Sequence, residues 1–193
     1  MTASISGVAV LAGCVRNGDD GGRDDDSGGS GDPTSGPGLD FDEDCSVHDP
    51  ENIEIEEYDD GWLVVDGDLQ MLFSENLDDA ERAREIIQAY GFNRQCFVER
   101  PDPDMEYWLV DGEPPAAGDA DVGDEDCLKF DPANLEIVET GGGWRINDGS
   151  MQMLVVETEE AAEKVLDIIE HYGFEHQCFV GRPHPPMSYF LTE

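Results

Sequence analysis

Apolar residues alternate with acidic ones in the first ordered stretch of the chain, where Ile53 and Ile55 are separated by a glutamate. This period of two is typical of a half-buried β-strand. Further strands are predicted at Trp62–Val65 and Leu69–Phe73, joined by an Asp-Gly turn at 66–67, a dipeptide that favours tight hairpins. The pattern therefore predicts three successive antiparallel strands.

The period then changes to that of a helix. Asn76 is a favourable N-cap and Gly91 a favourable stop, because glycine adopts the left-handed conformation that ends many helices. Strands are predicted at Gln95–Val98 and Met105–Val110, on either side of an Arg-Pro-x-Pro segment. The residues between the helix caps place four apolar side chains on one face, namely Ala80, Ala83, Ile87 and Tyr90.

The whole pattern occurs twice, with an offset of 82 residues and no gap. When 42–111 is aligned with 124–193, 35 of 70 positions are identical. Residues 112–123 are interpreted as a linker between the copies. The predicted fold class is therefore α+β: two tandem small β-β-β-α-β-β units, each an antiparallel sheet with one helix.

Cysteines recur with the repeat, and their pairing follows from the assumption that each unit is autonomous. Four cysteines allow three pairings, and only pairing within each copy leaves both units independent. Closing a loop of about fifty residues stabilises a small unit by roughly 4 kcal/mol in the chain-entropy model. The predicted disulfides, which require an oxidising compartment, join Cys45 to Cys96 and Cys127 to Cys178.

The N-terminal segment predicts export. Its apolar run at 5–13 is too short to cross a bilayer core of about 30 Å but suits a signal peptide, assigned here to 1–13. The sequence Leu-Ala-Gly-Cys ending at Cys14 resembles a lipobox, which implies lipidation of that cysteine. Residues 14–41, rich in Gly, Asp, Ser and Pro, are predicted to be a disordered acidic linker. The protein is therefore expected at the outer face of the cytoplasmic membrane, held there by its lipid.

Charge narrows the environment and the partners. The chain has 47 acidic and 10 basic residues, for a formal net charge of −37. Nucleic acid is excluded as a partner because phosphate binding needs positive charge. At ionic strengths of about 1 M the Debye length falls to about 3 Å, so self-repulsion largely disappears. The composition resembles that of proteins from extremely halophilic archaea, and adaptation to high salt is expected.

Candidate binding residues come from the aromatic and arginine positions that recur in both copies. A guanidinium beside aromatic faces can recognise a carboxylate, a sugar or a peptide. The alternative is that Trp and Tyr fill the core while Arg pairs with one of the many acids. The candidates are Trp62, Arg100, Tyr107, Trp144, Arg182 and Tyr189.

No catalytic or metal-binding motif stands out, and no cofactor is predicted. A zinc ribbon is disfavoured because no Cys-x-x-Cys occurs, although His171, His176 and Cys178 are close in sequence. The alternating acids at Asp40-x-Asp42-x-Asp44 and Asp119-x-Asp121, with Asp124 and Asp126, resemble calcium loops but lack the glycine at position six and the glutamate at position twelve.

The segment from 172 to 189, with Gly-Trp-x-x-x-Asp-Gly upstream, resembles a repeat of secreted bacterial and archaeal proteins whose copies often read Cys-Phe-Val-Gly-Arg-Pro. That resemblance implies location and a modular role, not an activity. We therefore expect a non-enzymatic, lipid-anchored binding or interaction protein with a cell-envelope, peptide or glycan partner. The alternatives are an extracellular hydrolase with its site between the units and a cation-binding structural module.

Overall fold

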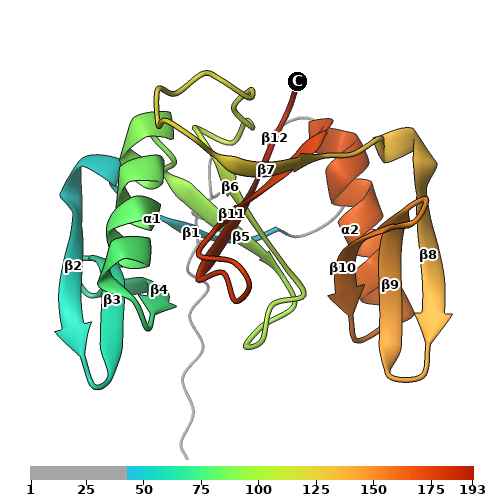
Figure 1. Ribbon diagram of the computed structural model, residues 1–193, viewed down its shortest axis with the longest axis horizontal. Helices are drawn as coiled ribbons and strands as arrows, with labels where there is room; N and C mark the ends of the chain where they lie inside the picture. The colour runs from blue at the N-terminus through green and yellow to red at the C-terminus, as the bar shows by residue number, and fades with distance from the viewer. Residues whose placement is uncertain (1–42) are drawn as a thin grey trace, which may run out of the picture. The chain divides into compact units, whose positions relative to one another are not determined.

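The computed structural model describes residues 43–193 (Figure 1). The predictions for the segments 1–13 and 14–41, including Cys14, lie outside these residues. Within 43–193, neither long helix has the length and apolarity needed to cross a membrane.

The first repeat forms six strands, one 3-10 turn and one α-helix. In chain order they are β1 (Asp44–Val47), η1 (Pro50–Asn52), β2 (Ile53–Tyr58), β3 (Gly61–Asp66), β4 (Leu69–Ser74), α1 (Leu77–Tyr90), β5 (Arg94–Val98) and β6 (Met105–Leu109).

The second repeat has the same elements. They are β7 (Asp126–Lys129), η2 (Pro132–Asn134), β8 (Leu135–Thr140), β9 (Gly143–Asp148), β10 (Met151–Val156), α2 (Glu159–Tyr172), β11 (His176–Val180) and β12 (Met187–Leu191). The α+β class, the tandem units and the order β-β-β-α-β-β are confirmed. Strands β1 and β7 precede that order and were not predicted, because four residues with mixed burial show no clear period.

Each repeat folds its strands into two three-stranded antiparallel sheets rather than one. The helix separates the hairpin strands β2–β3–β4 from β5 and β6, which form a second sheet in the order β1–β5–β6. The second repeat likewise forms sheets β8–β9–β10 and β7–β11–β12. The unpredicted strands β1 and β7 thus complete the second sheet of each repeat.

The helices begin and end where the sequence predicts. The side chain of Asn76 accepts a hydrogen bond from the N–H of Asp78, and Thr158 accepts one from Ala161. Gly91 ends α1 in the left-handed conformation, with φ of 71°. These caps satisfy backbone groups that a helix end leaves without partners.

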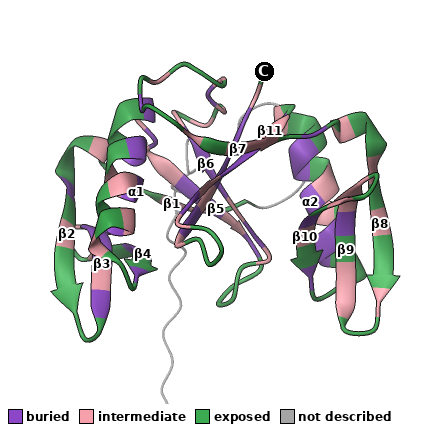
Figure 2. Ribbon diagram, viewed as in Figure 1, coloured by how far each residue is buried: buried purple, intermediate pink, exposed green. Residues whose placement is uncertain are grey.

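The two repeats share their hydrophobic cores reciprocally. Figure 1 shows β5, β6, β11 and β12 crossing between the two helix-bearing layers, and buried positions line these crossing strands (Figure 2). Helix α1 and sheet β2–β3–β4 pack on side chains of the second repeat: Cys178, Val180, Met187, Tyr189 and Leu191. Helix α2 and its sheet pack on the equivalent side chains of the first repeat: Cys96, Val98, Met105, Tyr107 and Leu109.

This exchange corrects the expectation that each unit is autonomous. Each helix-bearing layer closes its core with the disulfide-bonded sheet of the other copy. The described residues of both repeats accordingly group into one compact unit. The repeat boundaries remain a description of the sequence, but they do not separate two independently packed cores.

The predicted disulfides are confirmed, although the reason given for them was wrong. Cys45 bonds Cys96 and Cys127 bonds Cys178, with a sequence separation of 51 in each case. Each bond joins residues that face each other in a sheet, the first pair across β1 and β5 and the second across β7 and β11. Each disulfide therefore stabilises the sheet that packs against the helix of the other repeat.

The segment 112–123 is more than a tether. Val122 is buried in the core beneath α1, with 3% of its surface exposed. The N–H of Ala117 donates to the carbonyl of Thr192, and the N–H of Thr192 donates to the carbonyl of Pro115. The connection between the repeats is thus fastened to the end of the chain.

Candidate functional site

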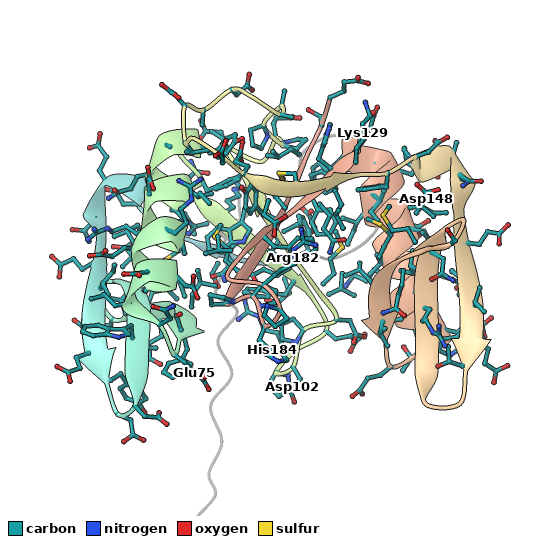
Figure 3. All side chains as sticks on the ribbon, viewed as in Figure 1. Glu75, Asp102, Lys129, Asp148, Arg182 and His184 are labelled. Atoms are coloured by element: carbon teal, nitrogen blue, oxygen red, sulfur yellow. A yellow bond between two sulfur atoms is a disulfide. The ribbon has the colours of Figure 1, made fainter. Side chains whose placement is uncertain are left out.

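A surface hollow lies where the two repeats meet. Its volume is about 840 Å³, and Figure 3 labels three of its lining residues, Glu75, Arg182 and His184. One wall is the end of β4 and the start of α1, and the other is the Arg-Pro loop between β11 and β12. The lining residues are Phe73, Ser74, Glu75, Asn76, Asp79, Gly181, Arg182, Pro183, His184, Pro185 and Pro186.

Phe73 gives the hollow an exposed aromatic face. It is the last but one residue of β4, and 42% of its surface is accessible. Three prolines of the opposite wall add rigid apolar surface, while Ser74, Asn76 and His184 offer polar groups. Apolar walls with a few polar groups are typical of ligand sites.

The two arginines predicted to bind a partner are engaged by acids of their own repeat. Arg182 makes a two-pronged contact with the Asp126 carboxylate, and its guanidinium lies 4.7 Å from the ring centroid of Phe179. The hydrogen bonds from Arg182 hold the pKa of Asp126 below its usual value. The charge of Arg182 is thus largely neutralised at the edge of the hollow.

Arg100 has an equivalent but looser arrangement in the first repeat. It lies 3.0 Å from the Asp44 carboxylate and donates to the hydroxyl of Ser46 at 3.1 Å. Its guanidinium stacks over Phe97 at 3.9 Å. The alternative that arginine pairs with nearby acids therefore describes both copies.

The predicted tyrosines lie inside the protein, so the prediction that they form a binding surface is wrong. Tyr107 and Tyr189 have no exposed surface. The hydroxyl of Tyr189 donates to Glu125 at 2.7 Å, and Tyr90, at the end of α1, donates to the same carboxylate at 2.9 Å. Glu125 and Tyr189 belong to the second repeat and Tyr90 to the first, so the hydrogen bond from Tyr90 fastens one copy to the other.

The equivalent cluster repeats this arrangement with the copies exchanged. Tyr107 and Tyr172 donate to the carboxylate of Glu43, at 2.8 and 2.6 Å. Burial, together with the nearby carboxylate, raises the pKa of both tyrosines, so their hydroxyls remain protonated donors. Sequence reasoning missed both clusters, although each of their positions is identical in the two copies.

The two predicted tryptophans do not join the arginines in one patch. Trp62 and Trp144 are half-buried and pack against the two different cores. Of the six predicted binding residues, only Arg182 lines the hollow.

Close approach at one contact between the repeats shapes the hollow. Gly181 has φ of +75°, and a Cβ at that position would lie 2.6 Å from Oδ2 of Asp79 at the start of α1. The equivalent positions in the other copy are Glu99 and Ala161. The contact between Asp79 and Gly181 combines an acid on the helix with glycine on the loop, whereas the equivalent positions hold alanine on the helix and an acid on the loop.

A buried polar group distinguishes the first repeat from the second. Glu106 accepts a hydrogen bond from the buried side chain of Gln95 at 2.6 Å, and burial raises its pKa to about 8. His48 is 5% exposed, packs its ring edge on Trp108, and has its pKa lowered by burial. The counterparts of Glu106, His48 and Trp108 are Ser188, Phe130 and Phe190. His48 and Trp108 are buried in the core, Glu106 is half-buried at its edge, and none of the three lines the hollow.

The possible metal ligands do not form a metal site among residues 43–193. Glu43 and Glu125 each lie close to two cysteine sulfurs, but those sulfurs form disulfides and are not free to bind a cation. Cys178 is likewise unavailable to His171 and His176. The two acidic runs predicted as possible calcium loops include Asp44 and Asp126, which are engaged by arginine.

Comparison with known proteins adds no assignment. A scan against protein-family models, a search of curated proteins and a search of solved structures found no match to this chain.

Proposed function

We propose that this chain is a non-enzymatic binding protein, exported and held at the outer face of the cytoplasmic membrane by a lipid on Cys14. Its ligand is an extended peptide or glycan segment of the cell envelope, received in the hollow between β4–α1 and the Arg-Pro loop. The proposal rests on one observation: the exposed ring of Phe73 and three prolines line the same hollow of about 840 Å³. Planar rings and prolines bind extended chains at low entropic cost.

The charges around the hollow favour a neutral or cationic segment. Glu75 and Asp79 contribute negative charge, and the arginine at the rim is already paired with Asp126. An anionic segment would meet both these acids and the repulsion of a chain with a net charge of −37.

The wall positions support recognition of a ligand by a rigid site. One wall is a capped helix start, and the other is a loop that follows a disulfide-bonded strand. Because both walls are anchored in the shared core, ligand binding requires little ordering of the protein.

High salt is the expected working condition. Self-repulsion of so acidic a chain is screened when the Debye length falls to about 3 Å near 1 M salt. The composition is the support for this part of the proposal.

The binding part is tested with the full chain carrying Cys14→Ser, applied in molar KCl to arrays of synthetic peptides and oligosaccharides. Phe73→Ala and His184→Ala are each expected to weaken binding about three- to tenfold, as loss of an aromatic or polar contact does. Asp102→Ala, at the position equivalent to His184 in the other loop, is the control and should bind like the wild type. Equal effects of His184→Ala and Asp102→Ala would exclude the hollow as the site.

The anchoring part has its own test in the native cell. Cys14→Ser should move the protein from the membrane fraction into the medium, because it removes the lipid site. Retention of this variant in the membrane fraction would contradict the lipid anchor without affecting the binding result.

A further inference from the structure

Strand β4 is the edge of its sheet on the side where the hollow lies. The sheet has the order β2–β3–β4, so β4 pairs on one side only. The hollow is lined by the last two residues of β4 and by Glu75 and Asn76, which follow them. Figure 1 shows this edge directed toward the loop between β11 and β12. An edge strand carries main-chain N–H and C=O groups with which an added strand can pair.

The register of the sheet shows which main-chain groups of this edge are directed outward. The hairpin between β2 and β3 is closed by a hydrogen-bonded pair, so the next residue of β3, Trp62, directs its main chain toward β4, where it lies opposite Ser74. Main-chain groups alternate in direction along a strand. The N–H groups of Phe73 and Glu75 are therefore directed away from β3, toward the open side of the sheet.

The second repeat shows how such an N–H group is satisfied within the protein. Glu157 is equivalent to Glu75, and its N–H donates to the carboxylate of Asp104 at 3.3 Å. Asp104 belongs to the loop between β5 and β6, so an acid of the first repeat closes the edge at the end of β10 in the second. Charged side chains at a sheet edge hinder its pairing with another chain.

The first repeat lacks this closure. The position equivalent to Asp104 is Pro186, whose side chain has no hydrogen-bond acceptor. Among residues 43–193, no group accepts a hydrogen bond from the N–H of Glu75. The group that is satisfied internally in the second repeat is therefore open in the first, at the hollow. An external acceptor can take the place that Asp104 has in the second repeat.

We propose that the hollow receives an extended peptide that adds a strand to the edge of β4, with its main-chain carbonyls accepting from the N–H groups of Phe73 and Glu75. This inference rests on the proposed function, because it names the ligand of the same hollow. Strand addition gives affinity through main-chain hydrogen bonds and specificity through alternate side chains. A glycan has no regular series of N–H and C=O groups, so the open edge favours a peptide.

The side chains around the hollow indicate which residues the peptide carries. Phe73 is exposed, and Glu75 and Asp79 line the same hollow. A cationic side chain can lie on the phenylalanine ring while its charge is attracted to the two carboxylates. Alternate side chains of an added strand share one face. We therefore expect lysine or arginine at alternate positions of the peptide.

The probe is a capped hexapeptide of alternating lysine and valine, titrated in molar KCl against the full chain carrying Cys14→Ser. Lysine complements the acids of the hollow, and valine favours an extended backbone. Binding should slow amide hydrogen exchange at Phe73 and Glu75, because their N–H groups then donate to the peptide. Exchange at Glu157, whose N–H already has an acceptor, should change little.

Two N-methylated forms of the hexapeptide separate main-chain pairing from attraction by charge. One form is methylated at the lysine amides and the other at the valine amides, and both keep the charge of the parent. In an added strand only one of these two sets of amides is directed toward β4. One form should therefore bind about tenfold or more weakly than the parent, whereas the other should bind as the parent does.

Pro186→Asp transfers the closure of the second repeat to the first. The new carboxylate should accept from the N–H of Glu75, as Asp104 does from Glu157, and weaken binding of the hexapeptide by about tenfold or more. Added negative charge alone would strengthen binding of a cationic peptide, so weakening reports the closure. Pro186→Ala removes the same ring without supplying an acceptor. Equal affinity of the two variants for the hexapeptide would contradict the inference.

The outcomes also separate this inference from the proposed function. A hexapeptide that does not bind, or two methylated forms of equal affinity, would overturn strand addition. If Phe73→Ala weakens binding while the methylated forms bind equally, the hollow remains a binding site but the peptide does not pair with β4. Array binding that Phe73→Ala leaves unchanged would instead exclude the hollow, and both proposals with it.

Discussion

Gly181 is the position where a single methyl group should disturb the contact between the repeats. Its φ of +75° lies in the left-handed region, where an L-residue costs about 1–2 kcal/mol more than glycine. In Gly181→Ala the new Cβ would lie 2.6 Å from Oδ2 of Asp79 and 3.0 Å from Cδ of Pro186. Overpacking of this kind typically costs a further 1–3 kcal/mol, for a total of about 2–5 kcal/mol.

The structure also specifies a rescue. Asp79→Ala introduces the residue that occupies the equivalent position, Ala161, and removes the atoms nearest the new Cβ. The double variant should therefore recover the steric part of the loss and keep the part due to the left-handed backbone.

Thermal unfolding in molar KCl measures both effects. Gly181→Ala should lower Tm by about 4–20 °C, at roughly 2–4 °C per kcal/mol for a protein of this size. The double-mutant cycle should give a coupling of about 1 kcal/mol or more between positions 79 and 181. An unchanged Tm for Gly181→Ala, or additive effects in the double variant, would refute the close approach on which the reasoning depends.

Three other predictions follow from charged and polar groups. The pKa of Glu106 is about 8 in the folded state and near 4.5 in the unfolded state, so the free energy of unfolding falls as pH rises between these two values. The Tm of Glu106→Gln should therefore fall less than the Tm of the wild type between pH 5 and 8.5. Parallel Tm curves would contradict the raised pKa of Glu106. Tyr90→Phe should lower stability by about 1–3 kcal/mol, because a hydrogen bond to the Glu125 carboxylate of the other repeat is lost. An unchanged midpoint in urea titration would show that the Glu125 cluster does not fasten the repeats. Transfer to millimolar salt should unfold the chain, monitored by circular dichroism, since 47 acidic residues then repel one another; a fully folded spectrum would refute the adaptation to high salt.

The local elements could be predicted because their signals are local. The Asp-Gly turn fixes the β3–β4 hairpin, and Asn76 and Gly91 bound the helix. Because the pattern occurs twice, each element is predicted independently in both copies, and the two predictions agree. The disulfide pairing was predicted from the assumption that each unit is autonomous; the pairing is confirmed, although that assumption is wrong.

The relation between the copies could not be predicted from the same signals. The sequence pattern of the apolar face that contains Val98 and Tyr107 would be the same if this face packed on the helix of its own repeat or on the helix of the other repeat. The difference depends on contacts such as Asp79 with Gly181, which no period reveals. Because the sequence pattern does not show which repeats are in contact, Tyr107 and Tyr189 were predicted to lie on the surface rather than at the contact between the repeats.

The differences between the copies make sense once the exchange is known. If the first repeat paired with itself in this way, Asp79 would face Glu99, which places two acids in one contact. The pairing of unlike copies instead sets Asp79 against Gly181, and the position equivalent to Asp79 in the second repeat is Ala161. The two sequences are thus complementary rather than simply duplicated.

The reciprocal exchange of cores is tested most directly by producing repeats 42–111 and 124–193 as separate, oxidised fragments in molar KCl. Each fragment alone loses five buried side chains that close its core; at about 1.5–3 kcal/mol for each large one, the loss is on the order of 10 kcal/mol. Side-chain dispersion in NMR and cooperative unfolding should therefore be absent from either fragment as a monomer and should appear when the two are mixed in equal amounts. Two separately folded monomers, with spectra that do not change on mixing, would contradict the exchange.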